Sequence, residues 1–136
     1  MRGLLLTALA ASTVAGPALA ELPPYVYERA RAEATSVVLV RVTSVGAIPN
    51  GADQGPCAFQ GVVTDVERGD DHAVGDTLNI DVPCVSADWT PRPGPFPGYP
   101  EVSLSMVRGA RLWLKNGQLV LRGLEDTLPP AYLVRP

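Results

Sequence analysis

The chain has 136 residues, of which 46% are hydrophobic, 14 are acidic and 11 are basic, giving a formal net charge of −3. This length is enough for one domain with one hydrophobic core. The acidic balance argues against nucleic acid as the main partner, because nucleic-acid-binding domains are usually basic. His72 is the only histidine and there are only two cysteines, which excludes a zinc site built from paired histidines and cysteines.

The first twenty residues have the features of a secretory signal peptide. Arg2 supplies a positive start, residues 4–14 form a short apolar run, and residues 18–20 read Ala-Leu-Ala, a small-x-small cleavage site. The run is too short to span a bilayer, which argues against a membrane anchor. We therefore expect cleavage after Ala20, export to the periplasm or the medium, and a single mature domain over residues 21–136 without a transmembrane span.

A helix and then a strand are expected at the start of the mature chain. Over residues 24–35, Val26, Ala30 and Ala34 recur four apart, which is the spacing of one helix face. Residues 36–45 follow as a strand. Its first half is apolar on both faces, which is typical of a central strand covered on both sides.

A β-hairpin is expected next, with strands over residues 57–66 and 77–84 joined by an acidic loop. The second strand alternates apolar and polar residues, and its apolar set ends at Cys84. The register that keeps every apolar side chain inward places these residues opposite each other: Cys57 and Cys84, Phe59 and Val82, Gly61 and Ile80, Val63 and Leu78. A glycine inside a strand also indicates a bulge or a sharp bend at Gly61.

The two cysteines lie at the outer ends of this hairpin. In an exported chain, a single pair of cysteines at such positions predicts one structural disulfide, Cys57–Cys84.

Residues 91–100 are dense in proline and contain Phe96 and Tyr99. Such a segment forms neither a helix nor an inner strand. Two alternatives remain: an extended strip that contacts a partner protein, or a stiff lid across the mouth of the domain. Residues 102–106 then alternate apolar and polar side chains, which predicts a short edge strand.

A second hairpin is expected around Asn116-Gly117, because this dipeptide between two apolar runs predicts a two-residue type I′ turn. The turn places these residues opposite each other: Leu114 and Leu119, Trp113 and Val120, Leu112 and Leu121, Arg111 and Arg122.

Five or six short strands with hairpin links predict an all-β fold, a small antiparallel barrel with one N-terminal helix. The segment 34–45, the run Gly61-Val62-Val63-Thr64-Asp65-Val66-Glu67-Arg68-Gly69, and the stretch from Val74-Gly75-Asp76 to Cys84 resemble the netrin-module and tissue-inhibitor-of-metalloproteinases-like superfamily, with its small exported bacterial members. This resemblance implies an OB-like barrel. The inhibitors chelate the protease zinc through an N-terminal cysteine, whereas Glu21 would stand there in this chain, so the inhibitory mechanism does not carry over.

Two groups of side chains are candidate sites. The first is a face of the second hairpin, consisting of Arg111, Trp113, Lys115, Val120 and Arg122, where cations flank an indole and would suit an anionic or aromatic ligand. The alternative, which we favour, is that the N-terminal helix or the proline-rich segment covers Trp113. The second group is the acidic set Asp65, Glu67, Asp70, Asp71 and Asp76, which has the oxygen ligands that calcium prefers. In the register above Asp65 opposes Asp76, although a solvated turn would have the same composition.

No catalytic constellation is visible in the sequence. We therefore expect an exported, non-enzymatic binding module that contacts a protein or another envelope component and needs no cofactor. Its contact surface would be the Trp113 face or the proline-rich segment. The alternative is a calcium-dependent protein or a hydrolase that uses the acidic loop.

Overall fold

A computed structural model describes residues 22–128, so the expected signal peptide and cleavage site lie outside the described residues. The elements in chain order are α1 (Pro24–Ala32), β1 (Ser36–Val45), the 3-10 helix η1 (Pro49–Gly51), β2 (Gln54–Arg68), β3 (Thr77–Val85), β4 (Tyr99–Pro100), α2 (Glu101–Ser105), β5 (Gly109–Lys115) and β6 (Gln118–Asp126). Within residues 22–128, no helix combines the length and the apolar character needed to cross a membrane.

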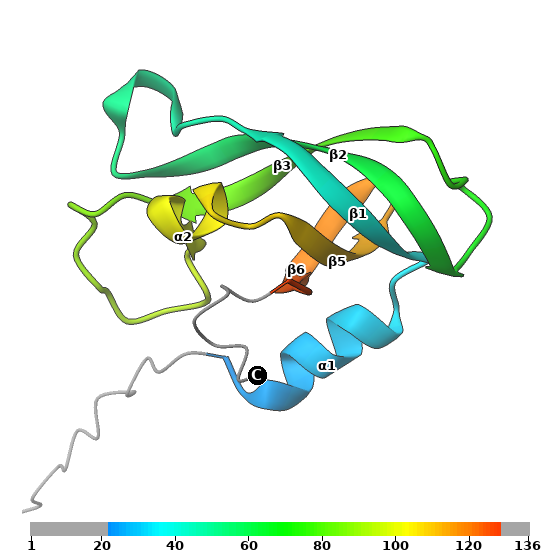
Figure 1. Ribbon diagram of the computed structural model, residues 1–136. Coiled ribbons are helices and arrows are strands. Elements are labelled where there is room, and N and C mark those ends of the chain that lie inside the picture. The colour runs from blue at the N-terminus through cyan, green and yellow to red at the C-terminus, as the bar shows by residue number, and fades with distance from the viewer. Residues whose placement is uncertain (1–21, 129–136) are drawn as a thin grey trace, which may run out of the picture.

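The strands form one curled sheet in the order β4-β3-β2-β1-β5-β6. All neighbouring strands are antiparallel except β3 and β4, which are parallel, so the sheet is mixed. The sheet folds over on itself into a half-barrel, with β1, β2 and β3 above β5 and β6, and α1 runs beneath β6 (Figure 1). The predicted small barrel-like all-β fold is confirmed.

The hydrophobic core fills the inside of the curl. Its largest fully buried side chains come from β2, α2 and β5: Phe59, Leu104, Leu112 and Leu114. Every second residue of β3 is buried, as its apolar–polar alternation predicts. β1 has the predicted bounds and is paired on both sides, by β2 and β5, and its buried neighbours Val37 and Val38 confirm that both of its faces are covered.

α1 ends at Ala32, three residues earlier than predicted. The backbone N–H of Thr35 already donates to the carbonyl of Leu114, 2.9 Å away, and therefore belongs to the sheet. Residues 33–35 are needed for the turn from the helix into β1. The most buried side chain of α1 is Tyr27, which lies outside the predicted face of Val26, Ala30 and Ala34.

The predicted register of the first hairpin is wrong by two residues. Phe59 pairs with Ile80, and Gly61 pairs with Leu78. A shift of two keeps every side chain on its predicted face, because the side-chain period of a strand is two. Backbone hydrogen bonds of the connecting loop fix the observed register over the predicted one. The N–H of Val63 donates to the Asp76 carbonyl, and the N–H of Gly75 donates to the Val63 carbonyl.

The bend predicted at Gly61 is confirmed. One extra residue of β1 lies between Val42, which pairs with Gly61, and Ser44, which pairs with Gln60. A Cβ atom at Gly61 would lie 3.1 Å from the Cβ of Val40. The missing side chain therefore lets β1 and β2 approach closely where the sheet curls.

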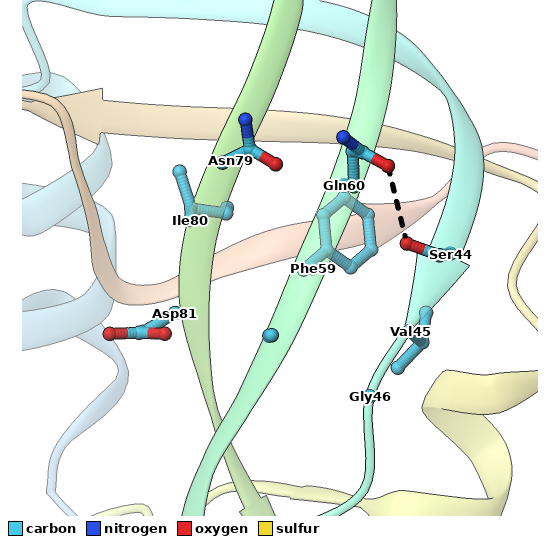
Figure 2. Close-up of a pocket in the computed structure, with 9 residues that line it drawn as sticks. Ser44, Val45, Gly46, Phe59, Gln60, Asn79, Ile80 and Asp81 are labelled. Atoms are coloured by element: carbon cyan, nitrogen blue, oxygen red, sulfur yellow. Dashed lines mark hydrogen bonds between the residues drawn. The ribbon is translucent and has the colours of Figure 1, made fainter.

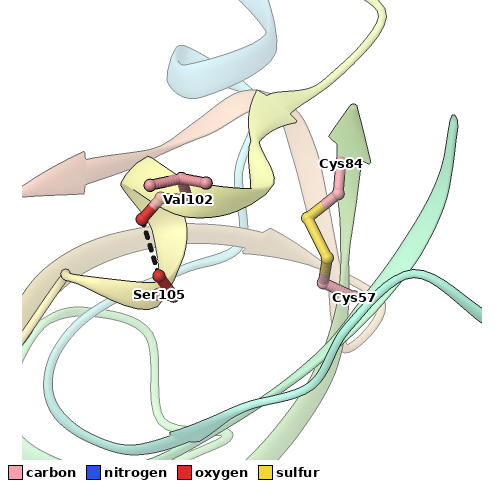
Figure 3. The surroundings of a disulfide bond; sticks show 4 residues. All are labelled: Cys57, Cys84, Val102 and Ser105. Carbon is pink, nitrogen blue, oxygen red and sulfur yellow. Dashed lines mark hydrogen bonds between the residues drawn. A yellow bond between two sulfur atoms is a disulfide. The ribbon is translucent and has the colours of Figure 1, made fainter. Parts of the chain in front are cut away.

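The Cys57–Cys84 disulfide is confirmed. The cysteines are diagonal neighbours, since Cys57 pairs with Val82 and Cys84 pairs with Gly55, and their Cα atoms are 5.9 Å apart. Both are fully buried, and the bond lies beside α2 (Figure 3). A disulfide is compatible with an oxidising extracellular or periplasmic compartment.

The predicted strand over residues 102–106 is wrong, because residues 101–105 form the helix α2. Helical spacing turns Leu104 inward and leaves Val102 and Met106 exposed, and the Ser105 hydroxyl donates to the Val102 carbonyl at 2.6 Å. The edge position is taken instead by β4, which pairs with the end of β3. This agrees with the prediction that the proline-rich segment is not an inner strand.

The turn of the second hairpin is confirmed, because Asn116 and Gly117 have φ values of 53° and 75°, both positive as a type I′ turn requires. Leu114 pairs with Leu119 as predicted. Beyond this pair the predicted register is wrong, since the partner of Leu112 is Leu124 instead of Leu121 and that of Arg111 is Glu125 instead of Arg122. β6 bulges out between these pairs. Trp113 therefore lies opposite the bulge, whereas the sequence predicted Val120 as its partner.

The bulge of β6 has two unusual residues. Arg122 has a φ of 51°, which few side chains adopt. A Cβ atom at Gly123 would lie 2.7 Å from the Trp113 carbonyl oxygen, so only glycine lets the strand pass there. The bulge pushes Arg122 out of the ladder and toward α1.

Candidate ligand-binding site

Arginine and aromatic side chains from four elements meet where α1 contacts β6. They come from α1, from the proline-rich segment with β4, from β5, and from the bulge of β6. We refer to them as the arginine–aromatic cluster, which consists of Tyr27, Arg31, Phe96, Tyr99, Trp113 and Arg122.

Arg122 is the centre of this cluster. Its guanidinium carbon lies 4.6 Å from the ring centroid of Tyr27 and 4.6 Å from that of Phe96. These distances are typical of cation–π contacts. The backbone carbonyl of Arg122 accepts two hydrogen bonds from the Nε and Nη2 atoms of Arg31, at 3.1 and 2.8 Å. The bulge therefore ties the helix, the proline-rich segment and β6 together.

Trp113 is half-buried under the helix. The guanidinium carbon of Arg31 lies 4.0 Å from the centroid of its ring, and that of Arg111 lies 6.0 Å away. This arrangement corresponds to the alternative that we favoured from the sequence, in which the N-terminal helix covers the indole. Only part of the Trp113 ring is open to a ligand.

Phe96 and Tyr99 pack edge to face, with ring centroids 5.0 Å apart. The Tyr99 hydroxyl donates to the carbonyl of Leu124 and accepts from its N–H, both at 3.1 Å. Because β4 is paired with β3, this residue bridges the gap between β3 and β6. The proline-rich segment therefore acts as a strap across the open side of the half-barrel, and the ring of its Phe96 contacts the Arg122 guanidinium.

Replacing Tyr99 by phenylalanine should lower the free energy of unfolding by about 1–3 kcal/mol, because two partly buried backbone groups of Leu124 lose their partner. Urea denaturation measures this change. Tyr25→Phe is the matched control, since Tyr25 is 59% exposed and should tolerate the same change.

The same pair of variants tests a pH dependence. Burial raises the pKa of Tyr99 above the usual tyrosine value of 10.0, so the folded state holds this proton more tightly than the unfolded state. The resulting stabilisation is complete below pH 10 and is lost as the pH rises through the folded-state pKa. The wild type should therefore lose stability above pH 10 more steeply than Tyr99→Phe, and parallel curves would contradict the assignment.

Two cations of the predicted Trp113 face lie outside the cluster. Arg111 forms an ion pair with Glu67, with an Nε–Oε1 distance of 2.5 Å, and a weaker one with Glu125 at 3.4 Å. The hydrogen bond from Arg111 lowers the pKa of the Glu67 carboxyl. Lys115 is exposed next to the hairpin turn and borders a separate shallow depression with Ala30.

A pocket of about 480 Å³ opens beside the cluster. Its lining combines an apolar wall with polar side chains of α1 and the β6 bulge: Leu22, Pro23, Pro24, Tyr27, Glu28, Arg31 and Arg122. The sequence analysis missed Tyr27 and Arg31 as site residues. Their spacing of four places them on one face of a helix, and this was the available signal.

A second depression, of about 420 Å³, lies on the outer side of β1, β2 and β3 (Figure 2). Ser44, Gln60, Asn79 and Asp81 border it, and the Ser44 hydroxyl donates to the side-chain oxygen of Gln60 at 3.4 Å. Its lining includes no cationic side chain, so it offers hydrogen bonds without the positive charge that the cluster provides.

Four of the predicted acidic residues have separate partners: Asp65, Glu67, Asp71 and Asp76. Asp65 pairs with Leu39 of β1, and its predicted position opposite Asp76 is wrong, because the shifted register of β2 and β3 brings Val63 to Asp76. The Asp71 carboxylate accepts a hydrogen bond from the Ser36 hydroxyl at 3.2 Å, and the Asp76 carboxylate accepts one from the N–H of Ala73 at 2.8 Å. In the described part of the chain, no three histidine, cysteine or acidic side chains are placed to hold one metal ion.

Comparisons with protein-family models, with curated proteins and with solved structures find nothing that matches this chain. The resemblance to the netrin-module superfamily thus stays a hypothesis from the sequence. The functional argument depends on the geometry of the cluster.

Proposed function

We propose that this protein is an exported, non-enzymatic binding module whose contact surface is the arginine–aromatic cluster. The observation that carries the proposal is the position of Arg122 between the rings of Tyr27 and Phe96. This contact joins the two surfaces that the sequence offers, the Trp113 face and the proline-rich segment, into one. The partner is a protein or another component of the cell envelope, and nucleic acid is not expected.

The physical basis of binding is a half-buried set of rings held in place before the partner arrives. Phe96 and Trp113 are each partly exposed and each stacked against an arginine. Side chains that are already ordered lose little entropy on binding. Aromatic and arginine residues commonly provide most of the binding energy at such surfaces.

Export is the part of the proposal that rests on residues 1–20, on the cleavage site at Ala20, and on the compatibility of the disulfide with an oxidising compartment. The alternative function, a calcium-dependent protein or a hydrolase at the acidic loop, has less support, because Glu67, Asp71 and Asp76 each have another partner.

Substitution in the cluster should weaken binding to an envelope partner at least tenfold, which corresponds to about 1.4 kcal/mol. The mature chain is immobilised, partners are captured from an envelope extract, and the affinity of the purified partner is measured. The cluster variant is Phe96→Ala with Arg122→Gln, and the comparison variant is Asp70→Ala with Asp71→Ala. Full binding by the cluster variant together with loss of binding by the acidic-loop variant would overturn the proposal.

A further inference from the structure

One side of β3 is open along residues 77–81. β3 pairs with β2 along its whole length, whereas β4 covers the other side only at Cys84 and Val85. In the described part of the chain, no further strand pairs with β3. Native proteins usually protect such an edge with a proline, a lysine, a bulge or a covering element. Residues 77–81 contain neither proline nor lysine, and they pair with β2 in an uninterrupted register.

The backbone groups that face this open edge belong to Thr77, Asn79 and Asp81. The Ala58 carbonyl accepts a hydrogen bond from the N–H of Gly46 at 2.7 Å, on the β1 side of β2. Ala58 pairs with Asp81, and when one residue of an antiparallel pair faces away from its partner strand, the other residue does the same. Asp81 therefore points its N–H and C=O away from β2. Alternation along the strand gives Asn79 and Thr77 the same direction.

Two depressions leave space on either side of this edge. The depression of about 420 Å³ on the outer face of β1, β2 and β3 extends to Asn79 and Asp81 (Figure 2). Another, of about 440 Å³, lies between residues 79–81 and the start of β6. The edge of β6 differs, because α1 and the Tyr99 hydroxyl of the strap cover it. The β3 edge is therefore the side of the sheet that another strand can approach.

The sequence of the β3 edge is complementary to itself. When two copies run antiparallel with Asn79 opposite Asn79, Thr77 of each copy opposes Asp81 of the other, and Leu78 opposes Ile80. The Thr77 hydroxyl can then donate to the Asp81 carboxylate, the two Asn79 amides can pair, and the apolar side chains meet on the inner face. No like charges are opposed. This alignment also places all the outward-facing backbone groups of the edge in hydrogen-bonded pairs.

We propose that two copies of this protein associate through the β3 edge and form a two-fold symmetric dimer in which the sheet continues from one copy to the other. The interface is isologous, since residues 77–81 of both copies form it. Backbone hydrogen bonds between the two edges supply the attraction, as in other cases of strand addition. The contact shares no residue with the arginine–aromatic cluster, so the inference goes beyond the proposed function and does not depend on it.

Sedimentation equilibrium of the mature chain measures this association at concentrations from about 1 μM to about 1 mM. Asn79→Lys places two positive charges opposite each other on the symmetry axis and should raise the dissociation constant of the dimer at least about tenfold. Asn79→Ser is the matched control, since it keeps an uncharged polar side chain at the same exposed position, and it should change this constant less than about threefold. A monomer throughout this range, or a dimer that Asn79→Lys leaves unchanged, would overturn the inference.

Mixing two charged variants tests the position of the symmetry axis. Asn79→Asp also opposes like charges in its homodimer, whereas a mixture of Asn79→Lys and Asn79→Asp opposes unlike charges. The mixture should therefore form a heterodimer at least about tenfold tighter than either homodimer. A variant that had lost its fold would not be rescued by mixing, so this result separates a disrupted contact from a disrupted strand. Equal association of the mixture and of the single variants would contradict the pairing of Asn79 with itself.

The cluster variant, Phe96→Ala with Arg122→Gln, separates this inference from the proposed function. Its β3 edge is unchanged, so it should form the dimer as the wild type does even where it no longer binds an envelope partner. If the cluster variant is monomeric while Asn79→Lys still forms dimers, the copies associate through the cluster and the β3 edge is not the interface.

Discussion

Replacing Cys57 and Cys84 together by alanine should lower the free energy of unfolding by about 3 kcal/mol. The two cysteines are 27 residues apart in sequence, and their bond restricts the unfolded chain over that span. Both residues belong to the core beside Phe59 and Val82, so the loss also leaves space inside the half-barrel. Urea denaturation under oxidising conditions gives the measurement.

The single variant Cys57→Ala is the control for this result. The bond needs both sulfur atoms, so the single variant should lose nearly as much stability as the double variant. Addition of a reductant should destabilise the wild type and leave the double variant unchanged. A loss below about 1 kcal/mol in the double variant would show that the cross-link contributes little, against the usual range for native disulfides in small exported domains.

The features that the sequence predicted correctly are local. β1 follows from the apolar run of residues 37–40 and the valines after it, and the faces of β3 follow from alternation. The type I′ turn at Asn116-Gly117 follows from the backbone conformations that these two residues tolerate. Each of these signals is contained within about ten residues, and no tertiary contact is needed to read it.

The register of the first hairpin illustrates what alternation leaves open. A strand that slips by one residue turns its apolar side chains to solvent, whereas a slip of two keeps them inward. Pairing Phe59 with Val82 or with Ile80 therefore satisfies the same pattern. The observed pairing with Ile80 depends on backbone hydrogen bonds of the loop around Gly75, which the sequence pattern does not encode.

The sequence predicted most residues of the arginine–aromatic cluster but not that they meet. Phe96, Tyr99, Trp113 and Arg122 were recognised as candidates by residue type, but on two separate surfaces. Their meeting depends on the bulge of β6, where the tight approach of Gly123 to Trp113 displaces Arg122 from the ladder. The Asn-Gly turn fixes only the pairs next to it. It therefore does not predict that Leu112 pairs with Leu124, three residues beyond the expected partner Leu121.

The cluster also protects the free edge of β6. Unpaired backbone groups at a sheet edge invite association with other strands. Arg31 donates to the carbonyl of Arg122, and the Tyr99 hydroxyl occupies both backbone groups of Leu124. The residues that form the proposed contact surface thus also hold the strap and the helix against this edge, so binding and stability are coupled.

Gly98→Ala should test this coupling directly, with an expected loss of unfolding free energy on the order of 3 kcal/mol. Gly98 has a φ of 148°, and a Cβ atom there would lie 2.7 Å from the carbonyl carbon and oxygen of Pro83. These are backbone atoms of β3, which cannot rotate away as a side chain would. The substitution should therefore separate β4 from β3 and withdraw Tyr99 from Leu124.

Gly94→Ala is the matched control in the same segment. Gly94 has a similar φ of 142°, but a Cβ atom there would meet nothing within 4 Å. Both variants carry the conformational cost of a side chain at positive φ, so the difference between them measures the close approach to β3 alone. Gly98→Ala should lose about 1–3 kcal/mol more than Gly94→Ala. If the strap positions Phe96 against Arg122, only Gly98→Ala should also weaken partner binding, and equal losses in the two variants would show that this approach does not hold the cluster together.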